Sequence, residues 1–404
     1  MVRKGLTYGN IQLVAVLYLV VWTVSPPMEI DLIYRLLALV CAAVWVGVMV
    51  IRQNPIVFEK EQIWAIFFML GVILIAYIEK GDLEGILRQI SFFMLVICFL
   101  MNYFYRYQWE ELQLVVPVVL VLLIAFNLKT VSVLLEDPTI ARKLVRDDES
   151  IYTYLRQGVG GYSLVYPQVC VFPAVLAWII KAYQNNKKYF ALGCVWLISY
   201  ILLVLNAGYA VAVFSTVAGA LLLFFYKGKS GIKAFLVASV IFAGAMLAIL
   251  YLDSFREWLL EIFDGTAVAK KINDLVASSD AGDAEGSIQA RVYVYSLSIQ
   301  RIFQYPIVGS LWRESGNGHS AVLDTFAKYG VLGGFIFIKI LYSVPNYYKK
   351  KSHDPYITRV ANATLVTLMI VSIMDTVTYS FSCMILIVLP LFFENIKKWS
   401  ELEE

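Results

Sequence analysis

Residues 189–226 read YFALGCVWLISYILLVLNAGYAVAVFSTVAGALLLFFY and are apolar almost throughout. A helix needs roughly twenty apolar residues to cross about 30 Å of hydrocarbon, so this block is too long for a single crossing. Asn206-Ala207-Gly208 interrupts the block near its middle. The block therefore predicts two consecutive membrane spans with a very short connection.

The composition of the whole chain supports a membrane protein. Of its 404 residues 60% are hydrophobic, whereas soluble globular domains are nearer half apolar. Aromatic residues make up 15%, which fits tryptophan and tyrosine belts at membrane interfaces. The formal net charge of +3 is too small to indicate a nucleic-acid partner. We therefore expect an all-α polytopic membrane protein.

Further apolar segments bring the expected number of spans to about twelve. They centre on residues 11–24, 32–51, 63–78, 86–104, 112–127, 162–182, the two halves of 189–226, 235–252, 321–344, 360–378 and 381–393. The first segment lacks a small-residue cleavage site, so we expect it to be retained as a span. The cysteines all lie in apolar runs, which supports neither a disulfide framework nor a thiolate metal cluster. They are Cys41, Cys98, Cys170, Cys194 and Cys383.

Short loops rich in lysine and arginine alternate with short loops that lack them, as the positive-inside rule requires. The basic side receives Arg3, Lys4, Arg52, Lys60, Arg106, Lys187, Lys188, Lys227, Lys229, Lys233, Lys349, Lys350, Lys351, Lys397 and Lys398. This alternation predicts that both termini are cytoplasmic and that the two long loops are external.

The expected organisation follows from these spans. Residues 1–128 hold spans one to five, and residues 129–161 form the first long external loop. Residues 162–252 hold spans six to nine, and residues 253–320 form a large external loop that carries the site helix. Residues 321–404 hold spans ten to twelve and a cytoplasmic tail.

The large external loop contains a stretch, residues 288–304, that is compatible with a helix ending at Tyr305-Pro306. On such a helix Arg291, Tyr295 and Ser298 share one face, and Arg301 lies next to it. Glycines then loosen the chain before the next span begins.

Arginines gather in both external loops. The planar guanidinium group stays charged and binds phosphate through two hydrogen bonds, so several converging arginines would hold a diphosphate. The plain alternative is that each is a solvated charge or the partner of a nearby carboxylate. The candidate diphosphate-binding residues are Arg142, Arg146, Arg156, Arg291, Arg301 and Arg313.

His319 precedes the tenth predicted span and is the candidate general base, because the pKa of a histidine lies near neutrality. The plain alternative is a helix-start residue bonded to backbone. Asp324, one turn deeper, either orients the imidazole or pairs with Lys328. Charges inside a membrane are costly to bury, so Asp375, Lys328 and Lys339 are secondary candidates.

The sequence contains no P-loop, no glycine-rich dinucleotide turn and no histidine cluster with metal-ligand spacing. Donors such as ATP or nucleotide sugars are therefore unsupported, and a donor that already resides in the membrane fits better. We expect no cofactor and no metal.

A set of short motifs follows in order over roughly 45 residues. They are Arg291, Tyr295-Ser296, Tyr305-Pro306-Ile307-Val308-Gly309, Gly318-His319-Ser320, Leu323-Asp324 and Tyr329-Gly330-Val331-Leu332-Gly333. This pattern resembles the O-antigen and capsular polysaccharide polymerases of the O-antigen ligase-polymerase superfamily. Arg142, Arg146 and Arg156 resemble an earlier arginine-bearing external segment of these enzymes more loosely.

The resemblance implies a GT-C-like glycosyltransferase of the bacterial plasma membrane with its active site on the external, periplasmic side. It would transfer a glycan from undecaprenyl diphosphate to the non-reducing end of another lipid-linked repeat unit, with inversion and without metal. Arg291, with Arg156 and either Arg301 or Arg313, would stabilise the departing diphosphate, and His319 would act on the acceptor hydroxyl. A chain-length regulator protein would be a further partner.

Other function classes remain open. A ligase would use the same donor but a different acceptor, and a lipid-linked oligosaccharide flippase would have a similar number of spans. A non-catalytic subunit of an export complex would not need converging arginines. A flippase is expected to place charges in a central cavity, whereas here they concentrate in the external loops, which favours chemistry at the membrane surface.

Overall fold

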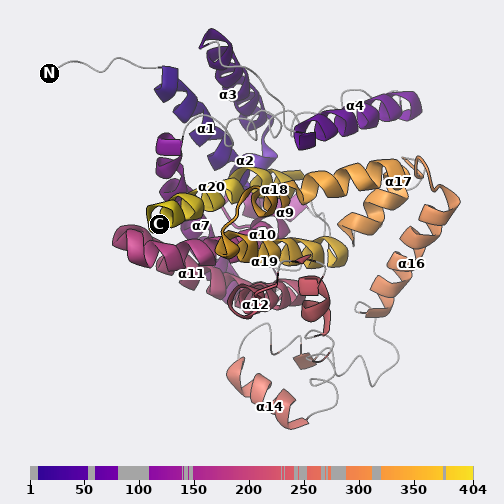
Figure 1. Ribbon diagram of the computed structural model, residues 1–404. Coiled ribbons are helices and arrows are strands. Elements are labelled where there is room, and N and C mark those ends of the chain that lie inside the picture. The colour runs from indigo at the N-terminus through magenta and orange to yellow at the C-terminus, as the bar shows by residue number, and fades with distance from the viewer. Residues whose placement is uncertain are drawn as a thin grey trace.

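The computed structural model of the protein describes residues 8–52, 60–80, 109–138, 140, 144, 149–228, 230–231, 233–240, 244, 253–264, 269, 272–273, 288–311, 320–375 and 379–403. All regular elements in these ranges are helices, as Figure 1 shows. The N-terminal helices are α1 (Tyr8–Val24), α2 (Pro26–Ile30), α3 (Leu32–Ile51), α4 (Lys60–Lys80), α7 (Trp109–Glu136) and α9 (Glu149–Arg156). The later helices are α10 (Tyr162–Asn185), α11 (Lys187–Ala207), α12 (Ala210–Phe225), α14 (Asp253–Ile262), α16 (Ile288–Gln304), α17 (Ala321–Leu341), α18 (Ser343–Lys351), α19 (Pro355–Met374) and α20 (Tyr379–Glu403).

Six of the described helices are long and apolar enough to cross a membrane. They lie in α3, α7, α10, α11, α17 and α19, and shorter apolar helices occupy 9–24 and 210–225. The expected class, an all-helical polytopic membrane protein, agrees with this. The number of about twelve spans stays a prediction, since the fourth predicted span lies outside the described residues and the ninth lies largely outside them.

Helix α10 is the centre of the bundle. It packs against α11, α12, α19 and α20, and Figure 1 shows these helices gathered around it. Most of its side chains are buried, including Trp178 and Tyr166. A span buried on nearly all sides reads as apolar all round, which is why its sequence shows no strong polar face.

A buried hydrogen-bond network fixes α10 to α7 and α11. The Gln168 amide donates to Asn127 Oδ1 at 2.7 Å, and the Asn127 amide donates to Gln168 Oε1 at 3.0 Å and to Ser199 Oγ at 3.3 Å. Trp196 Nε1 donates to Gln168 Oε1 at 3.1 Å. Because unpaired amides in an apolar interior are costly, this reciprocal pairing sets the register of the three helices.

The long apolar block divides where the sequence predicted. Helix α11 ends at Ala207, Gly208 adopts a left-handed φ of 67°, and α12 begins at Ala210. Glycine adopts this conformation without the steric cost that a Cβ imposes, so it is the common residue after a helix end. The split at Asn206-Ala207-Gly208 is therefore confirmed.

Helix α7 is longer than the predicted fifth span, since it continues from Asn127 to Glu136. Thr130 lies in this extension, is fully buried and accepts a hydrogen bond from Gly160 N at 2.9 Å. The start of the first long loop is thus helical and packed, not an open connection.

The bundle has aromatic and polar contacts at both of its ends. At one end of the bundle the rings of Tyr162 and Tyr209 lie 4.5 Å apart between centroids, which joins the start of α10 to the α11–α12 connection. At the other end the Asn362 amide donates to Gly228 O at 3.0 Å. We refer to these as the outer end and the inner end, following the predicted topology.

Candidate functional site

Helix α16 spans Ile288–Gln304, the bounds that the sequence predicted. Its end is a tight turn in which Tyr305 N bonds to Arg301 O at 2.9 Å and Gly309 N bonds to Tyr305 O at 3.0 Å. Pro306 has no N–H to continue the helix, and Gly309 has a φ of 82° that a side chain would disfavour. The Tyr305-Pro306 helix end is therefore confirmed.

Helix α17 is broken at Gly330, where φ is 65° and ψ is −170°. The turn after α16 fills this break with its own backbone. Ser310 N donates to Ala327 O and Leu311 N donates to Lys328 O, each at 2.8 Å, while Val331 N donates to Pro306 O at 2.8 Å. Groups that an unbroken helix would pair internally are paired here by the turn, as an apolar surrounding requires.

The two glycines permit this approach of backbone to backbone. A Cβ on Gly330 would overlap the carbonyl of Ile307, and a Cβ on Gly309 would overlap the carbonyl of Lys328. Leu311 follows with a left-handed φ of 54°, a conformation that costs a non-glycine residue about 1–2 kcal/mol. We call this feature the Gly309–Gly330 crossing. It holds the end of α16 against the middle of α17.

A side-chain contact adds to the crossing one turn from the start of α17. Ser298 on α16 is buried and donates from Oγ to Asp324 Oδ1 at 2.8 Å, and Ser320 N donates to Asp324 Oδ2 at 3.2 Å. The carboxylate thus caps the helix start and anchors α16. The predicted orientation of the His319 imidazole lies outside the described residues, and the predicted pairing with Lys328 stays a prediction. The first described residue after His319 is itself the N-cap, since Ser320 Oγ accepts from Leu323 N at 3.2 Å.

The end of α19 joins the same region. Tyr295 donates from its hydroxyl to Met374 O at 3.3 Å, and Ala321 N donates to Asp375 O at 2.9 Å. Tyr295 and Ser298 therefore both face the bundle, as the predicted shared helix face requires. These contacts place Ala321, two residues after His319 in the sequence, beside Asp375.

Asp375 is a buried carboxylate surrounded by tyrosines. Its side chain, 4% exposed as a residue, forms a hydrogen bond with the Tyr166 hydroxyl. The Tyr166 ring lies 5.1 Å from Tyr162 and stacks at 5.8 Å on Tyr209. Tyr162 and Tyr209 are half-buried, so the cluster is closed at Tyr166 and open toward the outer end. A carboxylate and phenols beside partly open aromatic rings suit the hydroxyls and C–H faces of a sugar.

The predicted arginines are placed unequally. Arg156 ends α9 and pairs with Asp31 at 3.3 Å, with 64% of its side chain exposed, which is the plain alternative considered for it. Arg301 lies half-buried in the last turn of α16. Arg291 lies within α16, but its side chain falls outside the description. Helix α9 packs on α2, and α16 packs on α17.

Other predicted residues lie outside the described part of the chain. They are Arg142, Arg146, Arg313 and His319. Among the residues that the structure describes, no three His, Cys, Asp or Glu side chains gather closely enough to hold a metal ion.

The tyrosines of the Asp375 cluster, Tyr162, Tyr166 and Tyr209, were not predicted from the sequence. Tyr162 and Tyr166 stand four residues apart at the start of a span, a spacing that places them on one helix face, but tyrosine at such a position also fits an interface belt. Asp375 was named as a costly charge without its partners. Comparison with known protein families and with curated proteins finds no match for this chain.

Proposed function

We propose that the protein is a polysaccharide polymerase of the plasma membrane. It would transfer a glycan from undecaprenyl diphosphate to the non-reducing end of another lipid-linked repeat unit. The observation that carries the proposal is the assembly at the outer end. There the Gly309–Gly330 crossing, the Ser298–Asp324 bond and the Ala321–Asp375 bond bring the arginine-bearing helix, the chain beside His319 and a buried carboxylate together.

The chemistry requires a leaving diphosphate and an activated hydroxyl. The acceptor oxygen forms a bond to the anomeric carbon while the bond from that carbon to the diphosphate oxygen breaks. Arg291 and Arg301 would stabilise the charge that develops on the diphosphate. Arg156 belongs to this group only if its exposed pair with Asp31 opens.

His319 is proposed to take the proton of the acceptor hydroxyl. Asp375 and the tyrosines Tyr162, Tyr166 and Tyr209 are proposed to hold the acceptor sugar. In this arrangement the carboxylate accepts a hydrogen bond from a sugar hydroxyl, and the half-buried rings contact the sugar face. A single displacement gives inversion at the anomeric carbon. The site faces the external side of a bacterial plasma membrane in this proposal, and a chain-length regulator is the expected protein partner.

The test uses the purified full chain in nanodiscs with a synthetic undecaprenyl-diphosphate oligosaccharide and neither nucleotide nor added metal. We expect wild type to form ladders of added repeat units. We expect Arg291→Ala, His319→Ala and Asp375→Asn each to lower the rate by about a hundredfold or more. His353→Ala is the matched control, because His353 is exposed between α18 and α19 and far from the proposed site in the chain.

Other outcomes would redirect the proposal. Transfer to an added lipid acceptor, without elongation, would mean a ligase. No transfer by folded wild type, together with lipid-linked oligosaccharide flipping that the variants leave unchanged, would contradict both the activity and the assigned residues.

A further inference from the structure

A second polar site lies at the inner end of α19. Asn362 is completely buried, and its amide donates to Gly228 O at 3.0 Å. Its Oδ1 atom has no hydrogen-bond partner among the described residues. A buried carbonyl oxygen without a donor is costly, so its presence calls for a ligand that brings one.

Lys349 directs its ammonium group to the same place. A Cβ added to Gly231 would lie 3.5 Å from Asn362 Oδ1, 3.6 Å from Lys349 Nζ and 3.8 Å from Leu365 Cδ1. These atoms therefore converge on one point that the missing side chain of Gly231 leaves free. The space holds one hydroxyl-sized or methyl-sized group in ordinary contact.

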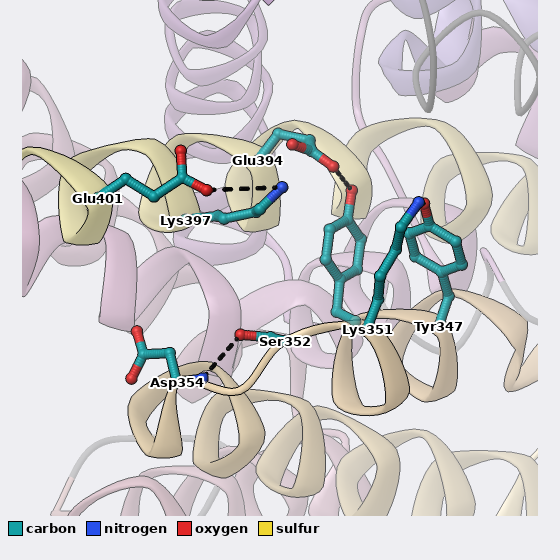
Figure 2. Close-up of polar contacts among 8 residues, drawn as sticks. Tyr347, Lys351, Ser352, Asp354, Glu394, Lys397 and Glu401 are labelled. Carbon is teal, nitrogen blue, oxygen red and sulfur yellow. Dashed lines mark hydrogen bonds and ion pairs between the residues drawn. The ribbon is translucent and has the colours of Figure 1, made fainter.

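The neighbouring lysines differ from Lys349. In Figure 2 Lys351 lies beside Tyr347 and Lys397 reaches Glu401; the Lys351 ammonium donates to the Tyr347 hydroxyl at 2.6 Å, and Lys397 lies 3.7 Å from Glu401. Lys350 is exposed to solvent. Partial burial lowers the pKa of Lys349, and an anion beside its ammonium group would offset this desolvation.

Described residues beside this point are held by hydrogen bonds. Tyr226 donates from its hydroxyl to Ser230 O at 2.7 Å. A Cβ on Gly228 would meet the Tyr226 ring, so glycine is needed there. Ser230 Oγ accepts from Lys233 N at 3.4 Å, and Ser230 O accepts from Ala234 N at 3.1 Å. The site is thus preorganised and loses little entropy on binding.

We propose that Lys349 and Asn362, beside Gly231, form a binding site for the headgroup of an anionic phospholipid that carries hydroxyls, such as phosphatidylglycerol. The phosphate accepts from the Lys349 ammonium, and a headgroup hydroxyl donates to Asn362 Oδ1 above Gly231. A lipid fits because the site lies at the ends of α12 and α19, where the headgroups of the inner leaflet meet membrane helices. This site is independent of the proposed glycosyl transfer.

The test is native mass spectrometry of the full chain released from nanodiscs that contain equal amounts of phosphatidylglycerol and phosphatidylcholine. We expect wild type to retain phosphatidylglycerol selectively. Lys349→Ala should lower its retention about tenfold or more, because a charge-assisted hydrogen bond is lost. Lys350→Ala removes the same charge from the next position and should leave retention unchanged.

A second variant separates binding from folding. Gly231→Ala introduces a methyl group that meets no atom closer than 3.5 Å, so the protein folds, but the methyl group occupies the ligand's place. We expect retention to fall as for Lys349→Ala, whereas Gly47→Ala, whose methyl group meets nothing within 4 Å, should have no effect. Equal losses for Lys349→Ala and Lys350→Ala, no lipid preference, or displacement of the lipid by inorganic phosphate would overturn the assignment.

Discussion

At its outer end helix α19 finishes in Asp375, which contacts Tyr166 through its carboxylate and Ala321 through its backbone, whereas near its inner end the buried Asn362 Oδ1 has no hydrogen-bond partner among the described residues. The outer end is built from contacts between helices from distant parts of the chain. The inner end also joins distant residues, since Asn362 bonds to Gly228, but it leaves space at Gly231. The difference indicates that the outer end is held rigid for positioning, and that the inner end is completed by a ligand.

The largest effect is expected from the Gly309–Gly330 crossing. Gly330→Ala would place a side chain on a residue with φ 65° and ψ −170°, a conformation that costs a non-glycine residue about 1–3 kcal/mol. Its Cβ would also overlap the Ile307 carbonyl, at about 1–3 kcal/mol more. Thermal unfolding of the purified protein should show a marked loss of stability. Gly47→Ala, in the open middle of α3, should instead be neutral or stabilising by up to about 1 kcal/mol. Similar melting temperatures for both variants would contradict the proposed rigidity.

An intermediate effect is expected from the bond between α16 and α17. Ser298→Ala leaves the buried side of Asp324 without this donor and should destabilise the protein by about 1–3 kcal/mol. Ser296→Ala is the matched control, since Ser296 is exposed and bonds only within its own helix, to Tyr293 O at 2.6 Å. If the two variants unfold at the same temperature, Ser298 does not anchor α16.

A smaller effect is expected where α9 meets α2. The Arg156–Asp31 pair is exposed, so Asp31→Asn should change the free energy of unfolding by less than about 1 kcal/mol. The same variant releases the Arg156 guanidinium group from this pair. Elongation should be unchanged, and if Arg156 contacts the diphosphate the protein should bind its donor more tightly. A loss of elongation in Asp31→Asn as large as in Arg156→Ala would mean that the pair is purely structural.

The smallest effect concerns pH at the inner end. Glu394 lies just beyond the last predicted span, where burial raises its pKa above the ordinary 4.5, and the hydroxyl of Tyr348, which donates at 2.7 Å, lowers it in part. A carboxyl whose folded pKa is raised is penalised when ionised. The stability from its protonated form is complete below the unfolded pKa and is lost as pH rises through the folded pKa.

The measurement is the melting temperature between pH 4 and pH 7. Wild type should lose stability as pH rises above about 4.5, and Glu394→Gln should lose less. Glu136→Gln is the control, because Glu136 is exposed at the end of α7. Parallel pH profiles for wild type and Glu394→Gln would show that burial of Glu394 has no energetic consequence.

Local signals in the sequence were sufficient for several parts of the fold. Proline at 306 fixed the end of α16, and glycine at 208 fixed the division between α11 and α12. The lysine pattern predicts which helix ends are cytoplasmic, and this topology stays a prediction. The eleventh span was predicted to begin at Val360, but α19 begins at Pro355, where Asp354 Oδ1 accepts from Tyr356 N at 2.7 Å. Hydropathy overlooks such polar capping residues, although Asp-Pro is itself a helix-start signal.

The candidate site was less predictable because it depends on contacts between distant residues. Tyr209 stacks on Tyr166, and Tyr166 bonds to Asp375, positions that hydropathy and spacing cannot relate. Local spacing suggested Lys328 as the partner of Asp324, a pairing that stays a prediction, and it did not indicate the contact with Ser298 that anchors α16. Helix propensity and charge patterns depend on residues that are close in the sequence. The crossing brings together Gly309, which follows α16, and Gly330 in α17, so these local signals do not reveal it.

The most direct test of the account compares Asp375→Asn with Gly231→Ala in the same nanodiscs, with both elongation and retained phosphatidylglycerol measured. We expect Asp375→Asn to lower the elongation rate by about a hundredfold and to retain phosphatidylglycerol. We expect Gly231→Ala to keep its elongation rate and to lose phosphatidylglycerol. Loss of both properties in each folded variant, or of neither, would contradict the assignment of different tasks to the two ends of α19.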